Sequence, residues 1–407
     1  MKQDEVNAYY MPSSYTMYID SYDPIEKHTN FDNKIFFHEF THFLQDLTLP
    51  YLMRQATIMN NSIYNFIEQC KKKQEVTAPF FWHDDYYVTS QQYEYTWGEG
   101  KYIEDFGSIV SHKQQSEHSI GDIEIHRFTL ESSNGITYPL SARDFLEYLS
   151  LCLQNKRWKK IEHIDIPYNI IRLTIDYLGF NILSDSSKVL LIEFCLYNDN
   201  PVAQLFFIHK NMRQDIIRHD TKGTLHIFLK NLVWNSKGNH SYNTSEKLRK
   251  RKEQLIDCFF CCYSDNNFTQ LREWLLNALN YKFPETHSPF LFHELFLLDP
   301  LTLKFRLEEF LNLIKIPVII NKYNHFEISV PNSDFLHAAH LFIRATTDSD
   351  KTCPLIKYRL CRGSNRYNSW CKCDFFQTLS LKENCVMFKF MCIFNINNFQ
   401  LQRISLI

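Results

Sequence analysis

The chain has 407 residues, of which 44% are hydrophobic and 22% are charged, a composition typical of folded globular proteins that excludes extended disorder. The length predicts two or three domains. The 44 basic and 46 acidic residues give a net charge of −2, and because polyanion-binding proteins carry basic surfaces, this balance argues against a nucleic-acid partner.

The N-terminal part predicts a strand followed by a helix. Residues Tyr15–Ile19 (YTMYI) have the composition of a strand. The helix is expected to begin near Asp32, with Asp32 or Thr29 as its cap, and to end before Pro50, which disfavours helical backbone in the residue preceding it. Between these limits, apolar residues recur at helical spacing, namely Phe36, Phe40, Phe43 and Leu47.

Helices and strands continue along the rest of the chain. The strand-like segments are Tyr86–Trp97 and Ile123–Leu130. The helical segments are Tyr51–Lys73, Ala142–Gln154, Tyr168–Leu178, Lys188–Tyr197, Leu271–Leu279 and Leu303–Ile314. Residues Ser236–Ser245 form the clearest loop, and the basic run Lys247–Lys252 after it is interpreted as a solvated helix face. Beyond Thr346 the pattern favours strands.

Three sequence features bear on the location of the protein. The chain has no apolar run near the roughly 18–20 residues that a membrane helix needs. The N-terminus, MKQDEVNAYYMPSS, is polar and lacks the apolar core of a secretory signal. The 12 cysteines of such a chain are interpreted as mostly reduced and buried. We therefore expect a cytoplasmic protein with no membrane partner.

Residues 38–42 form an HExxH sequence inside the first predicted helix. Residues four apart lie on one face of a helix, so His38 and His42 can bind one Zn²⁺ from the same side at about 2.0–2.1 Å. Glu39 between them can act as general base on a zinc-bound water. The motif therefore predicts a catalytic metal site.

The surroundings of the motif agree with this interpretation. The apolar stripe seats the helix in a core and places the two histidines on the side away from Phe40, together with Gln45 and Asp46. A carboxylate on that side can hold a ligand imidazole in the tautomer that binds a metal. The alternative is that two buried histidines lie on an ordinary core helix.

The segment HEFTHFLQDLT, which begins at His38, resembles the active-site helix of the zincin metallopeptidases. It is also similar to a group of bacterial cytoplasmic proteins with an N-terminal HE-[YF]-x-H-[FY]-x-Q pattern. The resemblance implies an α+β zincin-like domain and, as in zincins with a glutamate ligand, a third ligand from a carboxylate on a later helix. Zincins also use a Tyr or His at the oxyanion, for which Tyr168 is a candidate.

Three carboxylates are candidates for the third ligand. The segment Pro139–Ser150 is the best match to the ligand segment of the similar group and offers Glu147, although Tyr148 departs from the usual signature. Glu193 lies in an apolar run, where a carboxylate is costly to bury unless it is paired or bound to a metal. Glu99 lies in a predicted turn. We take Glu147 as the ligand and keep Glu193 as its main alternative.

Other histidines and cysteines give weaker signals. The spacings of Cys353, Cys361, Cys371 and Cys373 are not those of the paired C-x₂₋₄-C zinc sites, so free core thiols are favoured over a structural zinc. His337 and His340 lie one turn apart without an acidic residue in the motif, which favours a role in the core.

Together these features predict an α+β protein in three regions. Residues 1–205 would form a mostly helical zincin-like catalytic domain with a small sheet, residues 206–345 a helical region that binds substrate or a regulatory protein partner, and residues 346–407 a Cys-rich C-terminal region. We expect a zinc metallopeptidase that hydrolyses peptide bonds of an intracellular protein or peptide. Two alternatives stay open, a non-catalytic interaction or scaffold protein and a zinc hydrolase of non-peptide amides.

Overall fold

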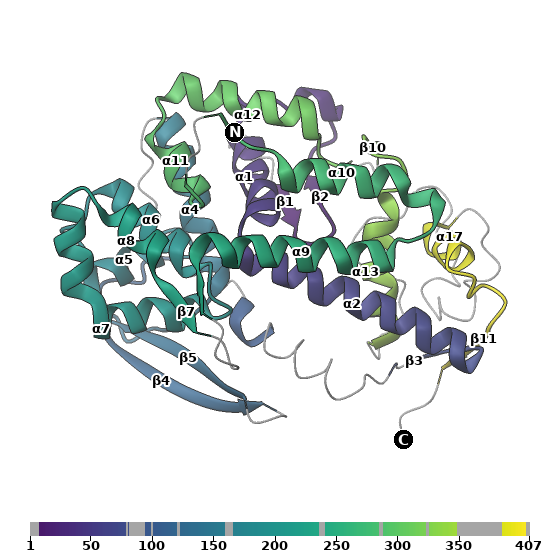
Figure 1. Ribbon diagram of the computed structural model, residues 1–407, viewed down its shortest axis with the longest axis horizontal. Helices are drawn as coiled ribbons and strands as arrows, with labels where there is room; N and C mark the ends of the chain where they lie inside the picture. Colours follow the sequence, from purple (N-terminus) through teal and green to yellow (C-terminus); the bar gives the residue numbers. More distant parts are fainter. Residues whose placement is uncertain are drawn as a thin grey trace.

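The protein is described here from a computed structural model, which covers residues 8–78, 80, 94–98, 101–119, 123–158, 166–235, 241–284, 288–322, 325–347 and 385–403. Within these residues it is mostly helical and contains several small sheets, so the α+β prediction is confirmed. Figure 1 shows the long helices α2 and α9 side by side through the middle of the molecule, with α10, α11 and α12 on one side of them and the β4–β5 hairpin on the other.

The bounds of the elements are as follows. The helices are α1 (Lys34–Thr48), α2 (Pro50–Lys73), α4 (Ala142–Arg157), α5 (Ile170–Tyr177), α6 (Asp185–Cys195), α7 (Pro201–Thr221), α8 (Leu225–Asn231), α9 (Thr244–Cys262), α10 (Thr269–Asn280), α11 (Leu291–Leu297), α12 (Pro300–Ile314), α13 (Asp334–Thr347) and α17 (Val386–Ile393). The strands are β1 (Ala8–Met11), β2 (Thr16–Ile19), β3 (Glu75–Ala78), β4 (Ile109–Ser119), β5 (Ile123–Ser132), β6 (Thr137–Leu140), β7 (Val233–Asn235), β8 (Ser241–Asn243), β9 (Val318–Asn321), β10 (Phe326–Ile328) and β11 (Gln400–Arg403).

The sheet that borders the candidate site has the order β1-β2-β9-β10. Strands β1 and β2 are antiparallel, whereas β2 and β9 are parallel, with Thr16 opposite Val318. Parallel neighbours need a long crossover connection, and here almost three hundred residues of chain supply it. Because β1 stands at the end of this order, it is an edge strand. Helix α1 packs against it.

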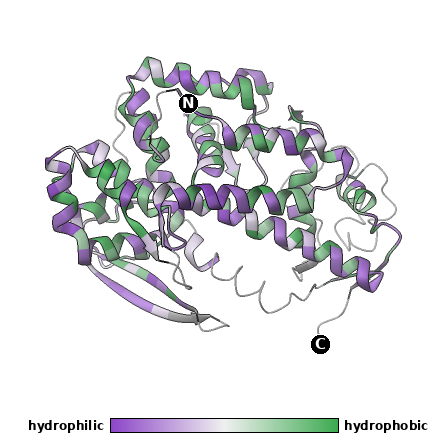
Figure 2. Cartoon of the chain, viewed as in Figure 1, coloured by the Kyte–Doolittle hydropathy of each residue, from purple (hydrophilic) through white to green (hydrophobic). Residues whose placement is uncertain are grey.

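Helix α1 is buried around most of its circumference because its apolar stripe enters an aromatic cluster. The ring centroids of Phe31 and Phe40 are 4.8 Å apart in an edge-to-face arrangement, which suits the quadrupoles of aromatic rings. The ring centroid of Phe310, on α12, lies 6.1 Å from that of Phe40 and 6.3 Å from that of Phe43. Figure 2 shows how hydrophobic and hydrophilic residues are distributed over these helices. This packing fixes the axis and the rotation of α1.

The cap of α1 differs from the sequence prediction. Asn33 caps the helix, since its side-chain oxygen accepts hydrogen bonds from the backbone N–H groups of Ile35 and Phe36. The carboxylate of Asp32 instead forms ion pairs with Arg157 and Lys304, with N···O distances of 3.0 and 2.7 Å. Asp and Asn are both good cap formers. The turn at residues 30–33 places Asn33, and not Asp32, at the cap.

The other predicted elements agree in part. Helices α2, α4, α5, α6, α10 and α12 confirm the predicted helical segments with small shifts at their ends. The strand predicted at Tyr86–Trp97 is wrong in its described part, because residues 94–97 are helical. The predicted loop Ser236–Ser245 contains strand β8 and the start of α9. Near the C-terminus both a helix, α17, and a strand, β11, are present where strands alone were expected.

The predicted division into three regions stays a prediction, although two observations bear on it. The boundary near residue 205 falls inside α7, and the boundary near residue 345 falls inside α13. Strand β9 of the second region also completes the sheet that contains β1 and β2 of the first. No helix among the described residues is long and apolar enough to cross a membrane.

A buried carboxylate joins the edge strand to α1. The Tyr10 hydroxyl and the Ser13 backbone N–H both donate to Oδ2 of Asp46, at 2.8 and 2.7 Å. Burial raises the pKa of Asp46 to about 7, although both hydrogen bonds oppose the rise. Because the pKa is raised above its unfolded value, the contribution of Asp46 to stability is fully present at low pH and is lost as the pH rises through 7.

This linkage predicts the behaviour of Asp46→Asn. The amide oxygen can keep both acceptor contacts, since Oδ1 has no hydrogen-bond partner among the described residues, while the ionisable group is removed. Between pH 4 and pH 8 the wild type should lose up to about 4 kcal/mol more unfolding free energy than the variant. Urea unfolding of both proteins across this range measures the difference. Parallel pH profiles would contradict the assignment.

Candidate metal centre

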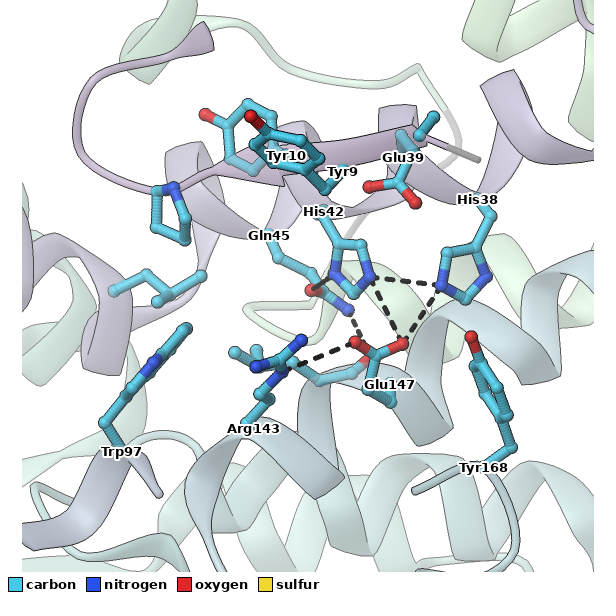
Figure 3. Close-up of a pocket in the computed structure, with 14 residues that line it drawn as sticks. Tyr9, Tyr10, His38, Glu39, His42, Gln45, Trp97, Arg143, Glu147 and Tyr168 are labelled. Carbon is cyan, nitrogen blue, oxygen red and sulfur yellow. Dashed lines mark hydrogen bonds and ion pairs between the residues drawn. The ribbon is translucent and has the colours of Figure 1, made fainter. Parts of the chain in front are cut away.

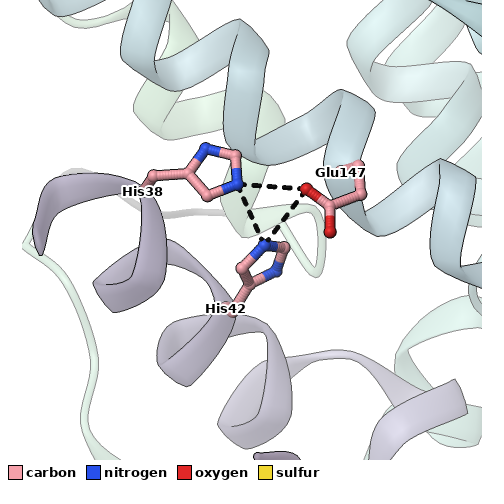
Figure 4. Close-up of side chains that lie close together, drawn as sticks. All are labelled: His38, His42 and Glu147. Atoms are coloured by element: carbon pink, nitrogen blue, oxygen red, sulfur yellow. Dashed lines mark hydrogen bonds and ion pairs between the residues drawn. The ribbon is translucent and has the colours of Figure 1, made fainter. Parts of the chain in front are cut away.

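Three side chains that are far apart in the sequence meet between α1 and α4. Nε2 of His38 lies 3.0 Å from Oε2 of Glu147, and Nε2 of His42 lies 3.5 Å from the same oxygen. The two Nε2 atoms are 3.2 Å apart. Figure 4 shows the two imidazoles projecting from one face of α1 toward the carboxylate on α4. The structure therefore brings together the three residues that the sequence singled out as metal ligands.

The spacing of these three atoms matches a tetrahedral metal site. Around an ion with bonds of about 2.0–2.1 Å, tetrahedrally arranged ligand atoms lie about 3.3 Å from one another. The observed separations of 3.0, 3.2 and 3.5 Å bracket this value. An ion at the centre of the three would need no rearrangement of the helices. Two imidazoles and one carboxylate are also a donor set that suits zinc.

The tautomer of His42 follows from its neighbour Gln45. The side-chain NH₂ of Gln45 donates to the backbone carbonyl of Leu146 at 2.8 Å, and a carbonyl can only accept. The amide oxygen of Gln45 must then face Nδ1 of His42, 2.8 Å away. Nδ1 therefore carries a proton, and Nε2 is the ring nitrogen that faces Glu147. Hydrogen bonds of this kind orient metal-binding histidines.

His38 has a similar arrangement. The side-chain oxygen of Gln154, on α4, lies 3.2 Å from Nδ1 of His38 and accepts its N–H. Nε2 of His38 is then free to face Glu147 and His42. The orienting groups are thus two glutamines. The expectation that the Asp46 carboxylate holds a ligand imidazole is wrong, because Asp46 is turned toward β1.

Glu147 is held in its ionised form. Burial alone would raise the pKa of its carboxyl, but His42 and His38 beside it hold that pKa well below its usual range. Arg143, one helical turn earlier, lies 3.9 Å from its second oxygen. Helix α4, which carries Arg143 and Glu147, begins with a capping box formed by Ser141 and Asp144. Glu147 is therefore a largely buried carboxylate of the cluster and not a solvent-exposed helix residue.

Glu39 lies in the same pocket but is not part of the three-atom cluster. Its burial raises the pKa of the carboxyl to about 8, and nearby His38 opposes the rise. In Figure 3 the Glu39 carboxylate lies between the strand that carries Tyr9 and Tyr10 and the two imidazoles. A carboxyl group with a pKa near neutrality is suited to exchange protons at physiological pH.

The pocket around these residues has a volume of about 370 Å³. Besides the cluster and Glu39, its lining includes Tyr9, Trp97, Arg143 and Tyr168 (Figure 3). Tyr168 stands with its ring centroid 6.1 Å from that of His38. Burial raises the pKa of Tyr168 to about 12, so its hydroxyl is a hydrogen-bond donor at neutral pH. No pattern in the sequence indicated that β1 or Trp97 would line this pocket.

The rival ligand Glu193 serves a different purpose. Its two carboxylate oxygens accept the backbone N–H groups of Phe292 and His293, at 3.1 and 2.8 Å, at the start of α11. Burial raises the pKa of Glu193 to about 8, against the effect of these bonds. Glu193 therefore does not join the two histidines. Its role is to satisfy the unpaired N–H groups at a buried helix end.

The remaining candidates do not belong to this cluster. Glu99 and the cysteines at 353, 361, 371 and 373 lie outside the described residues. His337 and His340 lie on α13, and burial lowers the pKa of each imidazole, to about 3 and about 4. Among the residues that the structure covers, His38, His42 and Glu147 are the one group whose geometry could hold a metal ion.

Comparison of the chain with models of protein families, with curated proteins and with solved structures finds no match. The assignment of the site consequently depends on its own geometry.

The geometry makes a direct prediction about zinc binding. Glu147→Ala removes one of three converging donors, so the affinity for Zn²⁺ should fall at least 10–100-fold. Glu193→Ala should leave the affinity unchanged, because Glu193 lies elsewhere. Competition titration of the purified proteins with a zinc chelator measures both. A variant at Glu193 that loses zinc while retaining its fold would contradict the assignment.

Gln45 provides a second, independent prediction. Gln45→Leu removes the oxygen that fixes the tautomer of His42 without touching a ligand atom, and the zinc affinity should fall about 10-fold. The matched control is Gln55→Leu on α2, which is absent from the pocket lining. The same chelator competition applies. Unchanged affinity in Gln45→Leu would show that His42 needs no orienting partner.

Proposed function

We propose that the protein is a zinc-dependent metallopeptidase. The observation that carries the proposal is the convergence of His38, His42 and Glu147 at tetrahedral spacing, with Glu39 in the same pocket. The arrangement leaves one side of the three-atom cluster facing the pocket. Three protein ligands with an open fourth position are typical of catalytic rather than structural zinc sites. The resemblance of the motif to the zincin active-site helix agrees with this proposal.

Each residue of the site would have its own role in the proposed reaction. When bound, zinc would supply the Lewis acid that polarises a carbonyl and makes water a nucleophile at neutral pH. Glu39 would take the proton from the attacking water and pass it to the leaving amine. Burial raises its pKa to about 8, and the positive charge of a bound ion would favour the ionised form that accepts a proton. His38, His42 and Glu147 would hold the ion, with Gln45 and Gln154 orienting the imidazoles.

Two donors in the pocket would stabilise the negative charge that develops on the carbonyl oxygen. The hydroxyl of Tyr168 keeps its proton at neutral pH, since burial raises its pKa to about 12. The Arg143 guanidinium lies on the opposite side of Glu147 in Figure 3. Donors that are positioned before the reaction stabilise such a charge without reorganisation. Tyr168 was the candidate that the sequence offered for this role.

The edge strand favours a peptide over other amides as the substrate. Ala8, Tyr9, Tyr10 and Pro12 of β1 and its continuation line the pocket, and β1 ends the order of its sheet. An extended peptide can add to a sheet edge through main-chain hydrogen bonds. A small non-peptide amide would not need such an edge. We therefore propose a protein or peptide substrate and keep the non-peptide amide hydrolase as the alternative.

The proposal is tested with Glu39→Gln. The amide retains the shape of the side chain but cannot accept a proton, so zinc content should be kept while turnover falls at least 10²–10⁴-fold. Proteome-wide sequencing of new N-termini on expression of the wild type and the variant measures the loss and identifies the substrate. The control is Glu68→Gln, an exposed carboxylate on α2 that pairs with Lys71.

Different results separate the alternatives. Zinc binding with the same set of N-termini in wild type and Glu39→Gln would favour a hydrolase of non-peptide amides, to be sought with such amides. Purified protein that neither contains nor takes up zinc would favour a scaffold protein whose HExxH helix is only part of the core.

A further inference from the structure

A second pocket, which shares no residue with the first, lies among α8, α9, α10 and α12. Its volume is about 570 Å³, within the range of ligand pockets. We call it the basic pocket, because its lining contains four cationic side chains, those of Lys230, Arg249, Lys252 and Lys282. No carboxylate is part of the lining as far as the described residues go.

The positive charge of the basic pocket is only partly compensated within the part of the chain that is described. Arg249 pairs with Glu253 at 2.6 Å, on the exposed surface of α9. Nζ of Lys252 donates to the carbonyl of Leu279 at the C-terminal end of α10, at 2.6 Å. Burial, followed by the charge of Lys282, lowers the pKa of Lys252. The two ammonium groups therefore repel each other across a partly dry space, which an anion would relieve.

The lining of the basic pocket also contains three aromatic side chains. Phe283 and Phe310 are stacked at 5.4 Å with an interplanar angle of 18°. The ring of Tyr281 stands edge-on to both, at 5.0 Å from each. All three rings line the pocket. Phe283 and Phe310 are buried, so a ligand that enters meets the cations and, of the three rings, the partly exposed Tyr281.

We propose that the basic pocket binds a nucleotide, a phosphate ester that carries a flat aromatic ring. Lysine and arginine side chains are strong partners for phosphate oxygens. Aromatic side chains bind nucleobases by stacking, without requiring a particular base. The chain has no glycine-rich phosphate loop, so the phosphates would be held by side chains. The basic run Lys247–Lys252 is then only partly a solvated face, because Arg249 and Lys252 belong to the lining of the pocket.

This proposal is tested by calorimetric titration of the full-length protein with ATP and with inorganic triphosphate. ATP should bind in the micromolar range and weaken as salt is added, and triphosphate should bind at least about tenfold more weakly because it lacks the ring. Lys282→Ala should weaken ATP binding about tenfold or more. Lys230→Ala, which changes another cation of the lining, is a second variant in case the first does not fold.

Lys250→Ala is the matched control. It removes the same charge from the same helix, but Lys250 lies over the ring of Tyr242, 3.6 Å from its centroid, and is not in the pocket. Its ATP affinity should stay within about twofold of the wild type. Absent ATP binding, equal binding of triphosphate and ATP, or equal losses in Lys250→Ala and Lys282→Ala would each overturn the proposal. Because binding is measured without turnover, this result does not depend on the proposed hydrolytic function.

Discussion

The candidate site depends on one side-chain amide between two helices. Gln45 of α1 donates to the Leu146 carbonyl of α4 and accepts from His42, so it fixes both the separation of the helices and the proton of the imidazole. Its NH₂ also reaches the hydroxyl of Ser150, 3.2 Å away. Leu146 is the residue that precedes Glu147 in the chain. The same contact thereby sets the position of two of the three converging side chains relative to each other.

Helix α1 can carry such a site because one of its sides packs in the core while the other faces the pocket. The side with Phe36, Phe40 and Phe43 is held in an aromatic cluster that reaches Phe310 of α12. The side with His38 and His42 faces the pocket. Burial of large aromatic side chains is among the stronger contributions to stability, and it offsets the cost of placing polar side chains on the other face. Rigid support of this kind is what a metal site needs.

The sequence could predict the parts of the site that depend on local spacing. His38, Glu39 and His42 follow from helical periodicity, and the amphipathic pattern places α2 and α4. Glu193 shows the limit, because its apolar surroundings correctly indicated a constrained carboxylate but not which groups constrain it. Those groups are backbone N–H donors of Phe292 and His293, about a hundred residues away. Strand β1 is short and depends on pairing with β2, so its own four residues carried little signal.

Two carboxylates of the pocket are placed in opposite electrostatic environments. Glu147 lies against two imidazoles, which hold its pKa well below the usual range, so it is an anion suited to coordinate a cation. Glu39 is fully enclosed, and burial raises its pKa to about 8 although nearby His38 opposes the rise. Pairs of acidic groups whose pKa values are driven apart commonly divide into one fixed charge and one proton carrier. In the proposed function, a divalent ion held by two neutral imidazoles and one carboxylate keeps a net charge of +1. That charge would favour the ionised form of Glu39, which is the form that accepts a proton.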